Sequence, residues 1–209
     1  MSKKQKITTV KNGPLVVENL DALHESVGQD VRTPACAVAL CRCGKSGTKP
    51  YCDGTHGKIG FTDEKSPDHV PRKVDLYIGA GITIHDDRGI CSHVGYCTDG
   101  LPSVFRMRKL PWIAPDEDTV ERIIETIRKC PSGALSYSID GVHYDHYSDT
   151  PRIKLAENGP YTVTGEIALN DKDTPISTEH YTLCRCGKSK NKPFCSGQHW
   201  KIKFVDDKN

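Results

Sequence analysis

The sequence predicts an α+β protein in which two small β-rich units, each stapled by metal, flank a mixed α/β unit. Three observations lead to this prediction. The two ends of the 209-residue chain repeat each other. The segment between them combines one amphipathic helix with alternating, strand-like stretches. Ten cysteines are spread over the chain, and nearly all of them fall at spacings typical of metal ligands.

The composition excludes several classes of protein. The chain has 29 Lys and Arg against 27 Asp and Glu, a net charge of +2, which gives no electrostatic case for nucleic-acid binding. The longest apolar stretches, Ala35–Cys41 and Ile78–Ile84, have the length of strands and fall short of the about 18 residues of a membrane span. The start, MSKKQKITTV, lacks the apolar run of a secretory signal. We therefore expect a cytoplasmic protein whose cysteines bind metal or carry redox chemistry rather than form disulfides.

The repeat defines the units. The segment CRCGKSGTKPYCDGTH (residues 41–56) aligns without gaps with CRCGKSKNKPFCSGQH (residues 184–199). Similar tails follow, ending at Phe61 and Phe204, and a Gly-Pro pair precedes a strand-like stretch in each copy. We expect three domains, at residues 1–67, 68–148 and 149–209. Units of about 60 residues have small cores and are often stabilised by metal.

The middle unit opens with an apolar stretch at 74–84. A helix is predicted by apolar residues at i, i+3, i+4 and i+7, namely Val120, Ile123, Ile124 and Ile127. Acidic residues at 116–118 and basic residues at 128–129 suit its dipole, and Pro131 ends it. Alternating residues at 135–139, the turn Asp140-Gly141 and the stretch 142–144 predict a hairpin.

Each repeat carries four potential metal ligands in the pattern C-x-C-x8-C-x3-H. They are Cys41, Cys43, Cys52 and His56 in the first copy, and Cys184, Cys186, Cys195 and His199 in the second. The cysteines of C-x-C face one side of an extended chain, and the last two ligands share one face of a helical turn. Asp53 or Ser196 is placed to cap that turn. These donors alone suit a zinc ion and an iron–sulfur cluster about equally.

The first copy, with Ser46, Pro50 and the run Cys52-Asp53-Gly54-Thr55-His56, resembles the CDGSH iron–sulfur family of mitoNEET-like proteins. The second copy differs at Ser196 and Gln198 but keeps all four ligand positions. The resemblance implies a 2Fe–2S cluster held by three Cys and one His in each copy; a structural zinc protein is the alternative. The family forms intertwined dimers. We therefore expect the two copies to pack as a pseudo-twofold unit within a monomer, with the middle domain inserted, rather than a homodimer of like repeats.

The middle domain carries a second pattern. Bacterial ferredoxins use C-x2-C-x2-C and a remote Cys-Pro; here Cys91, Cys97 and Cys130 occupy three of these positions and Val94 occupies the fourth. Together with the segments PWIAPD and CPSGAL, this cysteine pattern resembles the divergent mono-cluster 4Fe–4S ferredoxin-like domain. Three thiolates suffice for a 3Fe–4S cluster, whereas a 4Fe–4S cluster needs one more ligand. His93 is the nearest imidazole, and it is either that ligand or a hydrogen-bonding neighbour.

The remaining candidates are assigned structural roles. Cys36 is expected to be a small core residue of a buried strand. Six histidines lack ligand-like spacing and are expected on the surface or in structural hydrogen bonds: His24, His69, His85, His143, His146 and His180.

No Ser/His/Asp set, phosphate-binding loop or carboxylate pair indicates an enzyme. We expect a multi-cluster iron–sulfur protein acting in electron transfer; the alternative is cluster storage and transfer, or redox sensing. The partner would be a redox protein or an apo iron–sulfur acceptor, with no nucleic acid or membrane. Basic residues near the ligands form either a docking surface for an acidic partner or ordinary solvated loops: Arg42, Lys45, Lys49, Arg185, Lys188, Lys190 and Lys192.

Overall fold

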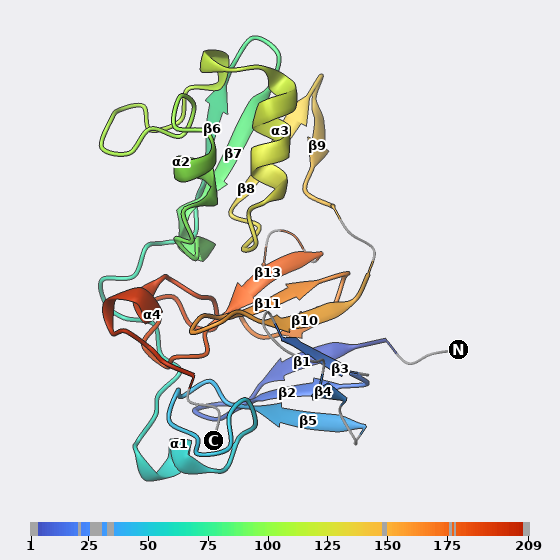
Figure 1. The fold of residues 1–209 in the computed structure, drawn as a ribbon, viewed down its shortest axis with the longest axis vertical. Coiled ribbons are helices and arrows are strands. Elements are labelled where there is room, and N and C mark those ends of the chain that lie inside the picture. The colour runs from blue at the N-terminus through green and yellow to red at the C-terminus, as the bar shows by residue number, and fades with distance from the viewer. Residues whose placement is uncertain are drawn as a thin grey trace.

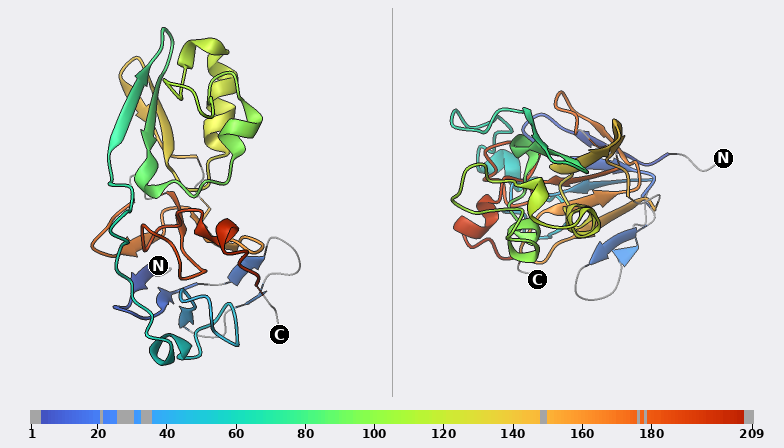
Figure 2. Two further views of the ribbon diagram at one scale, coloured as in Figure 1. Left: turned by 90° about the vertical axis from the view of Figure 1, so that its left-hand side faces the viewer. Right: turned by 90° about the horizontal axis from the view of Figure 1, so that it is seen from above.

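The computed structural model describes residues 4–20, 22–25, 31–32, 36–147, 150–175, 177 and 179–206. The protein is a small mixed α+β protein, as predicted, with short helices and three β-sheets in the described residues. The middle segment forms one lobe, and both ends of the chain form the other (Figures 1 and 2). None of the helices in the described ranges has the length and apolar character needed to cross a membrane.

The lobe formed by the chain ends contains two sheets. One has the order β12-β1-β2-β5 and the other the order β13-β11-β10-β3-β4. The strands of the first are β1 (Lys6–Thr9), β2 (Leu15–Glu18), β5 (Ala37–Leu40) and β12 (Ala168–Asn170). Those of the second are β3 (Ala22–Glu25), β4 (Val31–Arg32), β10 (Arg152–Leu155), β11 (Tyr161–Thr164) and β13 (His180–Leu183). In each repeat one four-residue helix follows the third cysteine. It is α1 (Thr55–Lys58) in the first repeat and α4 (Gln198–Lys201) in the second.

Each of these sheets includes strands from the other half of the chain: β12 in the first sheet, and β3 and β4 in the second. Strand β12 runs parallel to β1, with Leu169 opposite Ile7. Strand β3 runs parallel to β10, with Leu23 opposite Ile153. The two repeats are therefore joined by main-chain hydrogen bonds on both sheets and by side-chain packing.

One hydrophobic core serves both repeats. The corresponding strands β2 and β11 alternate buried and half-buried residues, the period expected of strands with one covered face. Their buried residues meet in a core fed by both halves: Ile7, Leu15, Val17, Leu23, Leu40, Ile153, Leu155, Tyr161, Val163, Tyr181 and Leu183. In the second repeat, Cys184, Cys186 and Phe204 form a further small cluster.

The middle lobe is an antiparallel sheet of order β6-β7-β8-β9. Its strands are β6 (Val74–Ile78), β7 (Thr83–Asp87), β8 (Leu135–Ile139) and β9 (Val142–Tyr144). Its helices are α2 (Tyr96–Gly100), α3 (Val120–Arg128) and the 3-10 turns η1 (Arg88–Ile90) and η2 (Pro115–Glu117).

Sequence analysis predicted the elements of this lobe well. Helix α3 begins after Thr119, whose side chain accepts a hydrogen bond from the Arg122 N–H, and it buries Ile123 and Ile127. The hairpin turns at Asp140-Gly141, both with positive φ, as a two-residue turn between strands requires. The helix and the hairpin are confirmed.

The prediction that Cys36 is a buried core residue is wrong. Cys36 is exposed, because strand β5 begins only at Ala37 and Cys36 lies in the bend before it. Its carbonyl accepts a hydrogen bond from the Asn19 N–H. Ala35, which begins the predicted strand, lies outside the described residues.

Candidate metal centres

The four ligand candidates of the first repeat lie in two close pairs. Cys41 and Cys43 directly follow β5, and their sulfurs are 3.6 Å apart. The turn of α1 brings His56 back towards Cys52, so that Nδ1 lies 3.3 Å from the sulfur.

The second repeat reproduces this arrangement. The sulfurs of Cys184 and Cys186 are 3.9 Å apart, and His199 Nδ1 lies 3.4 Å from Cys195 Sγ. Within the described residues, no group of three or more His, Cys, Asp or Glu side chains converges on the position of a single metal ion. Each centre is thus two pairs of donors rather than one group of four.

The two C-x-C segments lie against each other. Cys43 and Cys186 form an isolated antiparallel bridge. Gly44 and Gly187 follow them with positive φ, and a Cβ on either would come within 2.5 Å or 2.3 Å of the carbonyl oxygen of the opposite cysteine. Only glycine fits there, so the close approach of the two centres is built into the main chain.

Backbone N–H groups favour thiolate at these positions. The Cys43 thiol lowers the pKa of Cys41 to about 6, helped by N–H groups of Gly44 and Ser46. The Cys186 thiol does the same for Cys184, whose pKa is also about 6. The same hydrogen bond raises the pKa of Cys43 and of Cys186. Metals bind the thiolate, so one cysteine of each C-x-C pair is favoured as the first to bind a cation.

The loop that follows each C-x-C pair is fixed by matching contacts. Ser46 donates to the Tyr51 carbonyl and Ser189 to the Phe194 carbonyl. Asp53 accepts from the N–H groups of Gly47 and Thr55, and so caps α1 from just outside it. Ser196 accepts from the Lys190 N–H at the position equivalent to Gly47.

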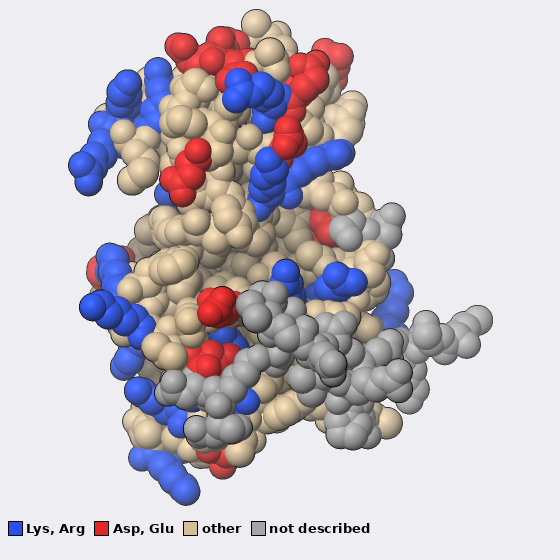
Figure 3. All heavy atoms as spheres, in the orientation of Figure 1, with Lys and Arg blue, Asp and Glu red and all other residues tan. Residues whose placement is uncertain are grey.

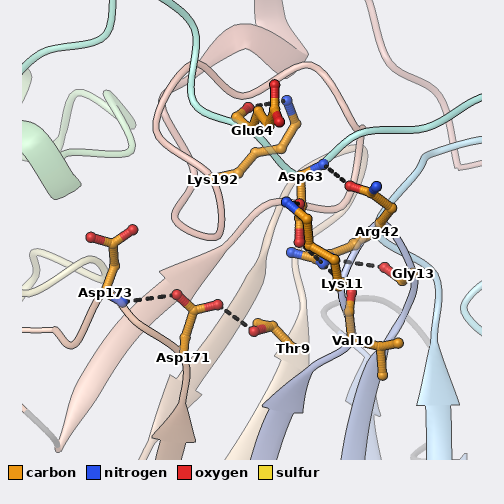
Figure 4. Close-up of polar contacts among 11 residues, drawn as sticks. Thr9, Val10, Lys11, Gly13, Arg42, Asp63, Glu64, Asp171, Asp173 and Lys192 are labelled. Atoms are coloured by element: carbon orange, nitrogen blue, oxygen red, sulfur yellow. Dashed lines mark hydrogen bonds and ion pairs between the residues drawn. The ribbon is translucent and has the colours of Figure 1, made fainter.

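The prediction that all the basic residues near the ligands lie on the surface is wrong for two of them. Arg42 and Arg185 are only 3% and 1% exposed. Arg42 donates to the carbonyls of Gly13 and Val10 and pairs with Asp63 (Figure 4). Its guanidinium also stacks on the Phe61 ring. A guanidinium with its donors so satisfied is stable inside a protein.

Arg185 repeats this network with the carbonyls of Gly159 and Ala156, the carboxylate of Asp206 and the ring of Phe204. The buried arginines therefore explain the Gly-Pro entry and the Phe-terminated tail of each repeat. Among the other predicted basic residues, Lys45 and Lys188 are exposed. Basic side chains are spread over both lobes and mixed with acidic ones in Figure 3.

The two centres differ in burial. Cys52 and His56 of the first are half-buried, whereas Cys195 and His199 of the second are buried. Burial lowers the pKa of His199, which favours the neutral imidazole that binds metal. Burial also raises the pKa of Cys195, to which negative charges on Cys184 and Cys91 add.

The predicted ligands of the middle domain line one cavity of about 740 Å³. Cys91 follows η1, Cys97 lies in α2 and Cys130 follows α3. Burial raises the pKa of the Cys91 thiol to about 12 and also raises the pKa of Cys97. The His93 N–H lies 3.4 Å from Cys91 Sγ, and His93 Nδ1 lies 3.9 Å from that sulfur and 3.5 Å from Arg88 Nη2.

Sequence analysis missed other residues of this cavity. Trp112, Trp200 and Asp86 also line it, and Arg88 stacks over Trp112 at 4.5 Å. The one available signal for Trp200 was its place in the repeat, where the first copy has Gly57.

Comparison with known families matches this layout. The family described as "Iron-binding zinc finger CDGSH type" matches residues 12–57 and again 158–200. The chain belongs to the CDGSH-type family. Between the two copies, residues 77–140 match the family described as "Divergent 4Fe-4S mono-cluster". The CDGSH-type protein is therefore an iron–sulfur protein with a mono-cluster domain between its repeats.

Relatives of this CDGSH-type chain are short. "Uncharacterized protein YjdI" from Escherichia coli K12 and from Escherichia coli O157:H7 are each 41% identical over 61 residues, which is 29% of this chain and 80% of each relative. No solved structure matches the chain.

Proposed function

We propose that the protein is an electron carrier with three iron–sulfur centres. Two 2Fe–2S clusters would be held by Cys41, Cys43, Cys52 and His56, and by Cys184, Cys186, Cys195 and His199. One 3Fe–4S or 4Fe–4S cluster would be held by Cys91, Cys97 and Cys130. Such clusters would supply one-electron chemistry; these residues would hold them, and the His93 and Gly197 N–H groups point at the sulfurs of Cys91 and Cys195.

The observation that carries the proposal is the pairing of the ligands. In a tetrahedral site with metal–sulfur bonds of about 2.3 Å, two sulfurs on one metal lie nearly 4 Å apart. The two sulfur pairs, at 3.6 and 3.9 Å, fit this spacing. The Cys–His pairs, at 3.3 and 3.4 Å, fit a second metal atom with mixed ligands. Two pairs favour a two-iron cluster over one zinc ion, which would draw all four donors together.

For the middle centre, the three cysteines in one cavity fit a 3Fe–4S cluster. His93 is our candidate for the fourth ligand of a 4Fe–4S cluster, because its Nδ1 lies close to Cys91 Sγ. Arg88 competes for the same nitrogen, which is the basis of the alternative hydrogen-bonding role. His93→Ala separates the two, since only a ligand changes the number of irons.

We further propose that residues 1–67 and 149–209 form a pseudo-twofold unit in a monomer, with residues 68–148 as an insertion. The reciprocal pairs β1–β12 and β3–β10 and the Cys43–Cys186 bridge support this arrangement. Because each repeat already receives its partner strand from within the chain, no second chain is required.

The test is the absorption and electron paramagnetic resonance spectrum of protein purified without oxygen, together with iron, sulfide and zinc analysis. Visible absorption with iron and sulfide sufficient for three clusters supports the proposal. A colourless protein containing zinc would favour the structural alternative.

A second candidate function is cluster donation. It is favoured by the half-exposed Cys52 and His56 of the first centre, since an accessible cluster can pass to an acceptor. Incubation with an apo-ferredoxin distinguishes the two functions: transfer of iron and sulfide indicates donation, whereas a protein that only reduces a holo-ferredoxin is an electron carrier. A redox protein or an apo acceptor is accordingly the partner we propose.

A further inference from the structure

The middle domain contacts the second CDGSH-type centre directly. A methyl group on Gly197 would lie 3.0 Å from His93 Cβ and 3.1 Å from the Ser92 carbonyl oxygen. Gly54, the equivalent residue of the first centre, has nothing within 4 Å of such a methyl group. The ligand loop of the middle centre is therefore packed against one repeat at this position.

The residues in contact are each hydrogen-bonded to a ligand sulfur. The His93 N–H lies 3.4 Å from Cys91 Sγ, and the Gly197 N–H lies 3.4 Å from Cys195 Sγ. A path from one sulfur to the other thus runs through two hydrogen bonds and short stretches of chain. Its one non-bonded step is the contact between His93 and Gly197.

Trp200 forms a second link. Its ring lies 5.1 Å from the ring of the ligand candidate His199, and it lines the cavity that contains Cys91, Cys97 and Cys130. The side chain is 64% exposed, so neither repeat's core requires it. The first repeat has Gly57 at this position.

The middle domain is held in this position by contacts to the second repeat. Asn191 donates to the carbonyls of Gly89 and Val70, the Tyr147 N–H donates to Glu179, and Ser177 donates to the Asp145 carbonyl. The first centre, in contrast, meets the second through the Cys43–Cys186 bridge. The contacts place the three centres in the order first, second, middle.

Resting on the proposed function, we propose that electrons pass directly between the middle centre and the second CDGSH-type centre through Trp200 and the His93–Gly197 contact, and that the first centre exchanges electrons with the middle one only through the second. With clusters bound at both sites, one electron would pass from the group held by Cys91, Cys97 and Cys130 to the group held by Cys184, Cys186, Cys195 and His199. No bond breaks and no proton moves. The initial electron comes from an external one-electron donor.

The test exchanges residues between the two repeats. One electron is injected into the oxidised holo-protein with a photoreduced flavin, and redistribution between the clusters is followed by absorbance and freeze-quenched paramagnetic resonance. Trp200→Gly installs the residue of the first repeat and is expected to slow transfer between the middle and second centres. Trp200→Phe keeps a ring and is expected to retain most of the rate. Gly57→Trp, the reciprocal change, is expected to leave that rate unchanged.

A second pair tests the main-chain contact. Gly197 and Gly54 have similar positive φ values of 72° and 85°, so alanine strains both equally, but only Gly197→Ala pushes against His93. We expect slower transfer in Gly197→Ala and an unchanged rate in Gly54→Ala. Equal rates in wild type, Trp200→Gly and Gly197→Ala, with full iron content, would overturn the inference.

A further measurement leaves Trp200 and Gly197 unchanged and uses the magnetic coupling between reduced clusters. The signal of the middle cluster is expected to stay broadened in Cys41→Ser/Cys43→Ser protein, which lacks the first cluster, and to sharpen in Cys184→Ser/Cys186→Ser protein. The opposite result overturns the order of the centres. Absence of clusters from the wild type would instead refute the proposed function.

Discussion

Lys49 and Lys192 occupy the same position in the two repeats but have different surroundings. Lys192 is half-buried, lies 6.0 Å from the centre of the Phe61 ring and donates to the Glu64 carbonyl (Figure 4). Burial lowers its pKa, while the thiolates of Cys184 and Cys186 act in the opposite direction. Its charge therefore lies within electrostatic range of the second centre.

We predict that Lys192→Gln lowers the midpoint potential of the second centre, because it removes a positive charge that stabilises the added electron. We expect a shift of roughly 60 mV, which corresponds to about 1.4 kcal/mol for a one-electron couple. Lys49→Gln is the control and should shift the first centre less. A redox titration followed by paramagnetic resonance measures both, and equal shifts would contradict the prediction.

Asp86 gives a prediction for the dependence of stability on pH. It is fully buried on β7, and the nearest cation, Arg88 Nη1, is 3.8 Å away. Burial raises its pKa to about 7, although Arg88 opposes this shift. The folded protein therefore keeps a proton that the unfolded chain releases near pH 4, and stability falls as pH rises between these values.

Asp86→Asn removes this titration, so the fall in stability between about pH 4 and pH 7 should flatten, by on the order of 4 kcal/mol at most. Apparent melting temperatures of the anaerobic holo-protein across this range provide the measurement. Asp140→Asn, a change at an exposed carboxylate in the β8–β9 turn, is the control. An unchanged slope in Asp86→Asn would show that the carboxyl is ionised in the folded protein.

At the scale of elements, the turn between β11 and β12 is constrained where the chain passes to the other sheet. A Cβ on Gly165 would lie 2.2 Å from both the Pro151 nitrogen and the Thr150 carbonyl carbon. Gly141, in the β8–β9 turn, has a similar φ of 78° against 75° but nothing within 4 Å. The positive φ favours glycine at both positions. At Gly165 the neighbouring main chain also leaves no room for a side chain.

Gly141→Ala should therefore cost about 1 kcal/mol from backbone strain, lowering the melting temperature by roughly 2–4 °C. Gly165→Ala should lower it much further, because main-chain atoms must move. Thermal unfolding followed by circular dichroism tests both. Similar losses in the two variants would mean that the Gly165 turn relaxes easily.

Local sequence signals predicted the local elements. Apolar spacing located α3, and Asp140-Gly141 located the β8–β9 turn, since each depends on neighbours along the chain. The pairing of β3 with β10 and of β12 with β1 has no such signal, because each strand completes its sheet with residues from the other half. The burial of Arg42 depends in the same way on Asp63 and on carbonyls of the β1–β2 turn.

For the whole molecule, ligand spacing located the candidate centres but could not show which of the two CDGSH-type centres is more exposed to solvent. Their difference arises from the middle domain, which packs against Gly197 and leaves Gly54 open. That contact depends on the fold of a third segment, and no spacing within the repeat encodes it. It makes two nearly identical motifs unequal in access to solvent.

We therefore predict that the two CDGSH-type clusters are lost in two phases when the holo-protein is mixed with an iron chelator at mildly acidic pH. Protons and chelator reach the half-exposed His56 sooner than the buried His199, so the first cluster should leave first. Decay of visible absorbance measures the phases. His56→Cys should change the fast phase alone and His199→Cys the slow phase alone; a single phase, or one affected equally by both variants, would contradict the assignment.

The exchange of β3 and β12 also bears on how the chain is made. Ile7 has no partner on one side of β1 until Leu169 has been synthesised, and Leu23 waits for Ile153. At about 5–20 residues per second, the N-terminal half remains incomplete for roughly ten seconds or more on a ribosome. During that interval Cys41 and Cys43 lack the Cys186 segment that packs against them. The four candidate ligands of the first repeat thus emerge early, but the Cys186 segment that packs against Cys43 follows only when nearly the entire polypeptide has been made.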